Sequence, residues 1–316
     1  MPKLKPIPGT EKIEFKPKFI ERYSELTDWK EFKKYTLSFL PKSIRINTLK
    51  KPISEIKKRL SKNWKLTPIP WCKEGFWIEH EKGRLDVGNT LEHNLGYYYV
   101  QESASMIPPI VLNPKPGEKV LDLCASPGSK ASQIAQYMKN KGVLVANDVS
   151  GSRLAALGIN MQRLGVMNSV ITQCKGEHFK GHEFDKILLD APCSGTGTIR
   201  KSIKTIKMWN PQTIKSIAGM QKKLIKNAFN LLKKGGILVY STCSLEPEEN
   251  EGVVDWLLRN NSDAGVEEIK LNIKKGNIIT KFGKNNYNPE VKKCLRLWPQ
   301  DNDTEGFFIS KISKKK

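Results

Sequence analysis

The stretch KVLDLCASPGSK, residues 119–130, decides the fold. Its first half is a short apolar run, which is typical of a strand buried on both faces. The turn SPGSK follows directly, and ASQIAQYMK (131–139) has the pattern of an amphipathic helix. A strand that leads through a glycine turn into a helix resembles a nucleotide-binding unit, so we expect an α/β protein.

The same alternation continues toward the C-terminus. Predicted strands cover 142–149, 168–174, 184–192 and 236–244, with predicted helices over 150–164 and 213–233. This pattern predicts a parallel sheet covered by helices on both faces. Two closing strands, 294–300 and 306–313, are expected to form a hairpin, and lysines 314–316 a frayed, solvated end.

The N-terminal third follows a different pattern. Aromatic residues at helical intervals before residue 40 predict short packed helices. Residues 43–60 predict a strand, a proline break and a helix, and residues 64–78 alternate as strands do. We therefore predict a small α+β region over 1–105, followed by a catalytic domain over 106–316.

The chain is strongly basic. It has 54 Lys and Arg against 32 Asp and Glu, a net charge of +22, and such a field attracts nucleic acid. Lysine enrichment in a thermophile or an A/T-rich genome is an alternative cause, and the two can coexist. In the N-terminal region, one predicted strand and helix carry six residues expected to meet RNA phosphates, namely Arg45, Lys50, Lys51, Lys57, Lys58 and Arg59.

Targeting and metal-binding patterns are missing from the sequence. The start MPKLKPIPGT has no apolar signal core, and no run of about 18 apolar residues could span a membrane. The 6 cysteines form no CxxC pair, and the 4 histidines are scattered. We expect a cytoplasmic monomer with free thiols and without a metal or a membrane partner.

Two elements predict a nucleoside cofactor. Gly128 allows close backbone approach at the start of a helix, and Asp148 ends the next strand, where a carboxylate can bind both ribose hydroxyls. The loop lacks GxGxxG and GxxxxGK[ST], which disfavours dinucleotides and nucleotide triphosphates and leaves a methyl donor. Asp122 fits cofactor binding and capping of loop amides equally well.

Two predicted strands end in cysteine-bearing turns, DAPCSGTG (190–197) and STCS (241–244). Strand ends of a doubly wound sheet line one crevice, so Cys193 and Cys243 should lie near each other. A lone cysteine is usually structural, but two at such ends favour catalysis. A thiolate that adds to carbon 6 of cytosine activates carbon 5 for methylation. The residues alone do not rank the two thiols.

Two charged residues complete this candidate site. Asp190 is placed to bind the exocyclic amino group and ring nitrogen 3 of a cytosine. Lys130 could favour the thiolate or hold the substrate, and a plain phosphate or surface contact is the alternative. A base must also remove the proton from carbon 5.

The motifs together resemble the NOL/NOP/Sun family of RNA cytosine methyltransferases. The resemblance runs from about Ile44 to the C-terminus and rests on LGYYYVQESAS, VLDLCASPGSK, ANDV, LLDAPCSGTGT, and YSTCS followed by PEENE. It implies a Rossmann-like class I domain that uses S-adenosyl-L-methionine, preceded by a small α+β basic RNA-binding domain. The implied reaction is methylation of carbon 5 of cytosine in RNA.

The resemblance also implies roles for single residues. Cys243 would be the nucleophile and Cys193 the helper in product release, whereas the Pro-Cys thiol of cytosine DNA methyltransferases would point to Cys193 instead. Asp190 and Lys130 complete the predicted catalytic set. The implied cofactor contacts are Cys124, Ala125, Ser126, Pro127, Gly128, Ser129, Lys130, Asp148, Arg153 and Asp190.

Two departures from the family pattern stand out. Ser129 replaces a usual glycine, which is acceptable if its φ is negative, and Lys175 stands where an aspartate normally contacts adenine. Lysine cannot accept that hydrogen bond. The rival to an active enzyme is therefore a non-catalytic RNA-binding assembly factor, while DNA methylation is disfavoured.

The RNA target is left between two classes. IRKSIKTIKMWNP (199–211) resembles members that act on tRNA, and MQRLGVMNSV (161–170) resembles members that act on rRNA almost as well. We expect tRNA, with rRNA as the alternative.

Overall fold

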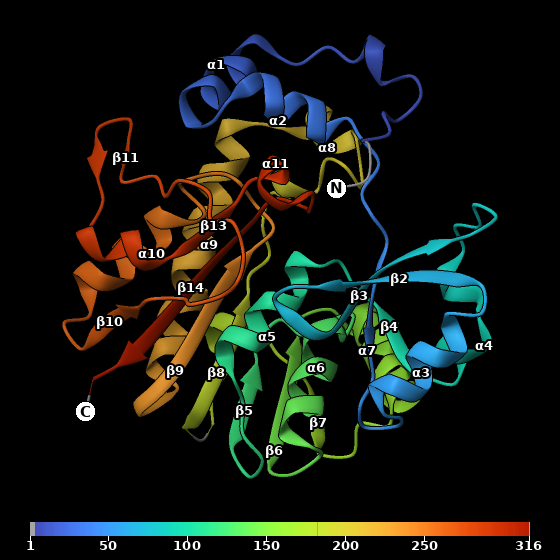
Figure 1. The fold of residues 1–316 in the computed structure, drawn as a ribbon. Coiled ribbons are helices and arrows are strands. Elements are labelled where there is room, and N and C mark those ends of the chain that lie inside the picture. The colour runs from blue at the N-terminus through green and yellow to red at the C-terminus, as the bar shows by residue number, and fades with distance from the viewer. Residues whose placement is uncertain (1–3, 182, 316) are drawn as a thin grey trace.

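A twisted eight-stranded sheet forms the centre of the protein (Figure 1). The computed structural model describes residues 4–181 and 183–315. The strand order is β10-β14-β9-β8-β5-β6-β7, and β13 pairs with β14. Five strands are parallel, namely β5 (Lys119–Asp122), β6 (Val143–Asp148), β7 (Ser169–Gln173), β8 (Phe184–Asp190) and β9 (Leu232–Thr242). This arrangement confirms the predicted Rossmann-like α/β fold.

Helices cover both faces of this sheet because its strands are apolar on both sides. Val120 packs into one core cluster and its neighbour Leu121 into the other. The first cluster lies under α5 (Ile107–Leu112), α6 (Ser129–Met138) and α7 (Gly151–Leu164), and the second under α9 (Pro211–Asn230) and α10 (Glu251–Asn260). None of the described helices is both long and apolar enough to cross a membrane.

The closing hairpin is present, but its end is not frayed. β13 (Leu295–Leu297) pairs antiparallel with β14 (Phe307–Lys314), which also pairs with β9 and β10 (Ala264–Glu267). Lys314 belongs to β14, and its Nζ donates to the carbonyls of Phe229 and Leu232 at 3.2 and 2.9 Å. The prediction of a solvated end was therefore wrong at Lys314, because carbonyls at the end of α9 and the start of β9 bind its ammonium group. Lys316 lies outside the described residues.

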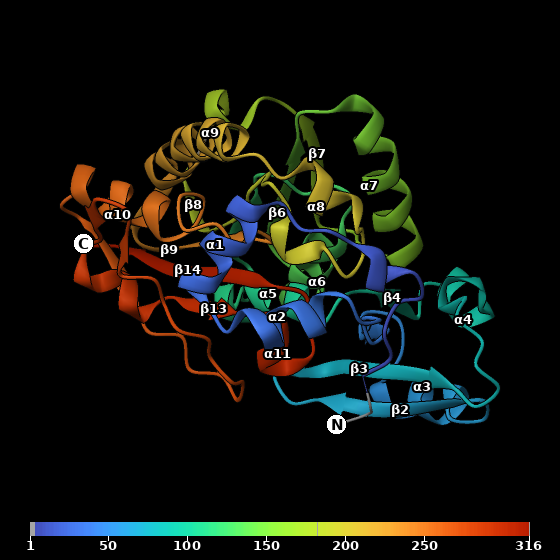
Figure 2. The same cartoon turned by 90° about the horizontal axis from the view of Figure 1, so that it is seen from above.

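A second, smaller sheet lies beside α7, with strand order β2-β3-β1-β4 (Figures 1 and 2). It contains β1 (Ser43–Ile46), β2 (Trp64–Ile69), β3 (Cys72–His80) and β4 (Tyr98–Val100). Helix α3 (Ile53–Leu60) covers one face, where Ile56 and Leu60 pack on Ile44, Ile46 and Tyr98. The strand–helix–strand pattern predicted for residues 43–78 is confirmed.

The two N-terminal helices pack against short helices from the C-terminal half of the chain (Figure 2). They are α1 (Pro17–Leu26) and α2 (Trp29–Thr36), and they contact the region of α8 (Lys204–Met208) and α11 (Pro299–Asn302). Phe19, Tyr23 and Phe32 form an aromatic cluster with Trp209 and Trp298. Short elements complete the chain, namely α4 (Leu91–Asn94), β11 (Lys281–Phe282) and β12 (Asn285–Asn286).

The structure corrects part of the predicted phosphate-binding set. Arg45 is fully buried, and its guanidinium donates to the side chains of Gln101 and Ser132 at 2.8 Å each. It therefore joins the small sheet to α6 and is not available to a phosphate. Lys50 Nζ also bonds to protein, donating to the carbonyls of Leu95 and Arg163 at 2.8 and 2.6 Å. Lys57 and Lys58 are exposed.

Candidate active site

The glycine turn between β5 and α6 has a backbone conformation that requires glycine. Gly128 has φ of 101°, in the left-handed region, and a Cβ there would lie 3.0 Å from Leu157 Cδ1. Ser129 is the first residue of α6 and is absent from the described non-glycine residues with positive φ. The change from glycine to Ser129 is therefore compatible with the backbone. The α6 amides that begin here favour an anionic group.

Asp148 lies at the end of β6 next to this turn and is 2% exposed. Its carboxylate accepts hydrogen bonds from the backbone amides of Ser126 and Ser150 at 3.3 and 3.0 Å. Arg153 Nη1 lies 3.4 Å from the same carboxylate. The three predicted cofactor residues Ser126, Asp148 and Arg153 are thus in mutual contact.

Asp122 ends β5 and carries a buried carboxylate that is 1% exposed. Neither of its oxygens accepts a hydrogen bond of ordinary geometry among the described residues, but the backbone amide of Cys124 still favours its charged form, so capping of loop amides and cofactor binding both stay open. Burial, together with the negative charge of Asp190, raises the pKa of Asp122 to about 7. A buried carboxyl group without a protein partner fits a ligand that brings a donor, such as an ammonium group.

A cavity of about 380 Å³ lies at the carboxyl ends of β5, β8 and β9. Eight of the predicted site residues line it, namely Cys124, Ala125, Ser126, Pro127, Ser129, Lys130, Asp190 and Cys243. Gly128, Asp148, Arg153 and Cys193 are not among its lining residues. Of the two predicted catalytic thiols, therefore, the one that lines the cavity is Cys243.

The two cysteines nevertheless contact each other. Cys193 Sγ lies 3.1 Å from Cys243 Sγ, and both residues are free cysteines. β8 and β9 are parallel neighbours with Asp190 beside Ser241, so the turns that follow them meet. The hydrogen bond with Cys243 and burial raise the pKa of Cys193 well above its ordinary value. Cys193 is therefore held as a neutral thiol.

Asp190 and Lys130 form an ion pair at the cavity wall. Lys130 Nζ lies 2.7 Å from Asp190 Oδ2, and Ser241 Oγ donates to Asp190 Oδ1 at 2.8 Å. Burial alone would lower the pKa of Lys130, but Asp190 offsets this effect, and the net shift is upward. Lys130 therefore stays positively charged beside Cys243.

The sequence reasoning missed a carboxylate that holds both cysteine turns. Glu249 accepts hydrogen bonds from the amide of Ser194 at 2.9 Å and from Ser244 Oγ at 3.0 Å. Gln221 Nε2 donates to it at 3.1 Å and to the carbonyl of Pro192 at 2.9 Å. The quoted PEENE segment contains this residue, but its role depends on contacts across 55 positions.

A half-buried and a buried acidic residue on the cavity wall were also missed. Glu102 and Glu305 both line the cavity, and the amide of Glu305 donates to Glu102 Oε1 at 3.4 Å. Burial and the nearby carboxylate of Glu102 raise the pKa of Glu305 to about 8. Glu102 lies within the quoted LGYYYVQESAS segment and Glu305 directly precedes the predicted closing strand, but neither belongs to a recognisable acid pattern.

Lys175, the departure at the end of β7, is exposed and precedes a 3-10 turn at Gly176–His178. It is not among the residues that line the cavity.

The fold and the strand-end cavity define the class of protein, a Rossmann-like methyltransferase with two cysteines in its site.

Comparison with protein families assigns most of the chain. Residues 109–313 match the family described as 16S rRNA methyltransferase RsmB/F, and residues 15–103 match the N-terminal domain of 16S rRNA methyltransferase RsmF. The chain belongs to the RsmB/F family, the Sun-type RNA cytosine-5 methyltransferases, as the motif resemblance predicted.

Individual relatives agree with this assignment. The chain is 46% identical over 309 residues to a tRNA (cytosine(49)-C(5))-methyltransferase of Pyrococcus abyssi. The aligned region covers 96% of this chain and 98% of that protein. It is 44% identical to ribosomal RNA small subunit methyltransferase F of Vibrio parahaemolyticus, over 87% of this chain. This chain spans only 57% of the length of the Vibrio protein.

Solved structures share the whole architecture. A methyltransferase homolog protein from Pyrococcus horikoshii superposes with a TM-score of 0.86 at 39% identity and covers 97% of both chains. NSun6 from Pyrococcus horikoshii, solved with SFG, has a TM-score of 0.81 at 26% identity and covers 96% of this chain and 99% of its own.

Proposed function

We propose that this enzyme methylates carbon 5 of a cytosine in tRNA, with S-adenosyl-L-methionine as methyl donor and Cys243 as nucleophile. The observation that carries the proposal is the grouping of Cys243, Lys130 and Asp190 on one cavity wall. The non-catalytic alternative requires a site that has lost its reactive groups, and here these groups are in contact with one another.

The residues around the cavity fit the proposed cofactor. The unpartnered carboxylate of Asp122 matches its ammonium group, and the start of α6 at Ser129 matches its carboxylate. In this proposal Asp148 binds the ribose hydroxyls, and the contact of Arg153 with its carboxylate supports a shared role for the two residues. SFG, the ligand of the NSun6 structure, is an analogue of S-adenosylmethionine, which supports the same choice. When bound, the cofactor supplies an electrophilic methyl group.

Attack on the base begins with Cys243. The positive charge of Lys130 lies close to this sulfur at the cavity wall, where it also holds Asp190 in place. The sulfur forms a bond to carbon 6 of cytosine, and the electrons of the 5,6 double bond become available at carbon 5. Asp190 accepts a hydrogen bond from the exocyclic amino group and shares a proton with ring nitrogen 3, where negative charge develops. Carbon 5 then accepts the methyl group.

Release requires loss of the proton on carbon 5. When that proton leaves, the electrons of the carbon–hydrogen bond re-form the double bond, and the bond between carbon 6 and sulfur breaks. Cys193 contacts Cys243 Sγ, so it is placed to assist this elimination. Its raised pKa favours the neutral thiol, which donates a hydrogen bond to the Cys243 sulfur as that sulfur departs as a thiolate, while a separate base accepts the proton from carbon 5.

The choice of tRNA rests on the Pyrococcus abyssi relative, which matches this chain over nearly its full length. The rRNA-modifying relative matches 87% of this chain, so rRNA is kept as the second candidate. It ranks second because this chain spans only 57% of that protein's length. A cytoplasmic location remains a prediction.

Transfer of labelled methyl groups tests the proposal. The purified protein, S-adenosylmethionine with a labelled methyl group, and separate pools of unmodified tRNA and rRNA transcripts would be incubated together. We expect label in 5-methylcytidine of tRNA, located by bisulfite sequencing. Label only in rRNA would support the second candidate, and no label in either pool would refute the enzymatic proposal.

A further inference from the structure

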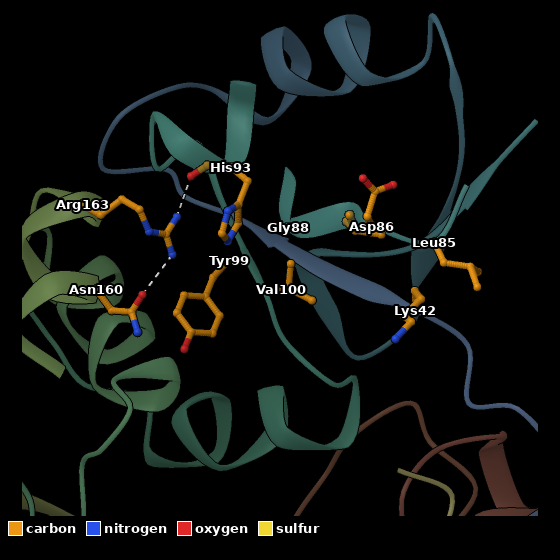
Figure 3. A pocket seen from close by; sticks show the side chains of 10 residues that line it. Lys42, Leu85, Asp86, Gly88, His93, Tyr99, Val100, Asn160 and Arg163 are labelled. Atoms are coloured by element: carbon orange, nitrogen blue, oxygen red, sulfur yellow. Dashed lines mark hydrogen bonds between the residues drawn. The ribbon is translucent and has the colours of Figure 1, made fainter. Parts of the chain in front are cut away.

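A second cavity of about 370 Å³ lies between the small sheet and α7 (Figure 3). We call it the flanking pocket. Figure 3 shows Arg163 and Asn160 of α7 facing Tyr99, with Lys42 lying beyond Val100. Its lining residues are Lys42, Leu85, Asp86, Val87, Gly88, His93, Tyr99, Val100, Asn160 and Arg163.

The flanking pocket adjoins the catalytic cavity. Tyr99 and Val100 line both spaces. Residues alternate along β4, so that Tyr98 enters the core under α3 while Tyr99 faces the other side. A ligand chain with one unit in the catalytic cavity can therefore reach the flanking pocket along Tyr99 and Val100.

Flat and cationic groups line this pocket together. The Arg163 guanidinium lies 5.8 Å from the centre of the Tyr99 ring and is held by the carbonyl of His93 at 2.6 Å and by Asn160 Oδ1 at 3.2 Å. Aromatic rings and guanidinium planes are the surfaces on which unpaired nucleobases stack.

The pocket also carries positive charge that the protein does not neutralise. The acidic residues of this region are paired elsewhere, Asp86 with Arg84 and Glu92 with Arg59. Neither Lys42 nor Arg163 forms an ion pair among the residues that the structure describes. One cation beside the aromatic ring and a second beyond Val100 fit a ligand with a base and a phosphate.

We propose that the flanking pocket binds the nucleotide next to the target cytosine, with its base stacked at Tyr99 and its phosphate near Lys42 and Arg163. This inference rests on the proposed function, since it takes RNA as the substrate. The pocket would then hold the strand in place while the target base occupies the catalytic cavity.

Steady-state methylation of a tRNA transcript pool tests the stacking contact. Base–aromatic stacking typically contributes a factor of about 5 to 150 in affinity, so Tyr99→Leu should raise KM about tenfold or more, beyond any fall in kcat. Tyr99→Phe keeps the ring and should restore KM to near the wild-type value. Tyr35→Leu is the matched control, because Tyr35 also lies near a guanidinium, that of Arg200 at 6.0 Å, but lines neither cavity.

The outcomes separate the two levels of the account. If the wild type methylates cytosine but Tyr99→Leu has the KM of Tyr35→Leu, the flanking pocket does not bind the neighbouring nucleotide. A KM raised equally in Tyr99→Phe would also overturn stacking. If the wild type transfers no methyl group, the proposed function fails instead. Lys42→Gln gives an independent check: it should reduce the salt slope of tRNA binding by about 0.7, whereas the α9 control Lys226→Gln should not.

Discussion

The Sγ atoms of Cys193 and Cys243 lie 3.1 Å apart, although the residues are 50 positions apart in the sequence. Parallel pairing of β8 with β9 places Asp190 beside Ser241, and each cysteine follows within three residues. The side chain of Glu249 then fixes both turns. The register of β8 against β9 and the buried carboxylate of Glu249 therefore hold the two thiols next to each other.

Replacing Glu249 should disturb catalysis through this positioning. In Glu249→Gln, an amide nitrogen replaces one carboxylate oxygen. The side chain can then no longer accept the hydrogen bonds from Ser194, Ser244 and Gln221 together. We expect kcat to fall about 10- to 100-fold, corresponding to roughly 1.4–2.8 kcal/mol, with a smaller change in KM for tRNA. Glu248→Gln is the control, since that side chain bonds to Arg22. Equal kinetics in both variants would show that Glu249 does not position the thiols.

Asp148 should contribute to cofactor affinity. Asp148→Ala removes the proposed acceptor for the ribose hydroxyls, so binding of S-adenosylmethionine should weaken by about 1.5–3 kcal/mol, the range for hydrogen bonds to charged groups. Asp148→Asn should lose less, because it keeps one acceptor. Calorimetry with Glu268→Ala as an exposed control measures both. Unchanged affinity in Asp148→Ala would remove this residue from the cofactor site.

Much of this site could be predicted from sequence because local rules determine it. Strand ends of a parallel sheet converge, so the glycine turn, Asp148 and both cysteine turns were expected at one crevice. Strand and helix periodicity predicted the single sheet with helices on both faces. The ends of elements were less accurate: the helix predicted to reach residue 233 ends at Asn230, and β9 starts at Leu232.

The features that could not be predicted from the sequence depend on packing between residues that are far apart along the chain. Arg45 lies between Ile44 and Ile46, which enter the small core, so alternation turns it to the opposite face. Only the position of α6 on that face decides that its guanidinium is buried. The same holds for Glu305, which comes near Glu102 across 203 positions.

The exposed lysines Lys57 and Lys58 should each contribute to RNA binding, whereas the buried Arg45 should not. Lys57→Gln with Lys58→Gln should reduce the salt slope of tRNA binding by about 1.4, or about 0.7 for each single-stranded phosphate contact. Arg45→Gln should instead lower the melting temperature, because its buried hydrogen-bond partners lose their donor. An unaltered slope in the lysine double variant would mean that this part of the surface is only solvated.

Glu305 should make stability depend on pH. Its pKa is raised from 4.5 in the unfolded chain to about 8 in the fold, near Glu102, Lys201, Lys130 and Arg200. The folded state therefore holds a proton that the unfolded state has lost, so the free energy of unfolding should fall as pH rises from about 4.5 to 8. Glu305→Gln cannot ionise and should be more stable than wild type at pH of about 9, by roughly 1–4 kcal/mol.

Denaturant titrations at pH values of about 5 and 9 measure this difference. Glu81→Gln, at an exposed position, is the control and should show the wild-type pH dependence. The same fall in stability for Glu305→Gln and wild type would show that Glu305 ionises normally in the fold.

The division of labour between the two thiols is tested most directly by trapping the covalent adduct. Wild type, Cys193→Ala and Cys243→Ala would be incubated with tRNA and S-adenosylmethionine and then separated by denaturing electrophoresis. We predict that Cys193→Ala accumulates a protein–RNA species, because it can attack and methylate but not release. Cys243→Ala should form no adduct and no product, since no bond to carbon 6 can form. An adduct that persists in Cys243→Ala and is absent from Cys193→Ala would contradict the assignment, and full activity in both variants would show that neither thiol is catalytic.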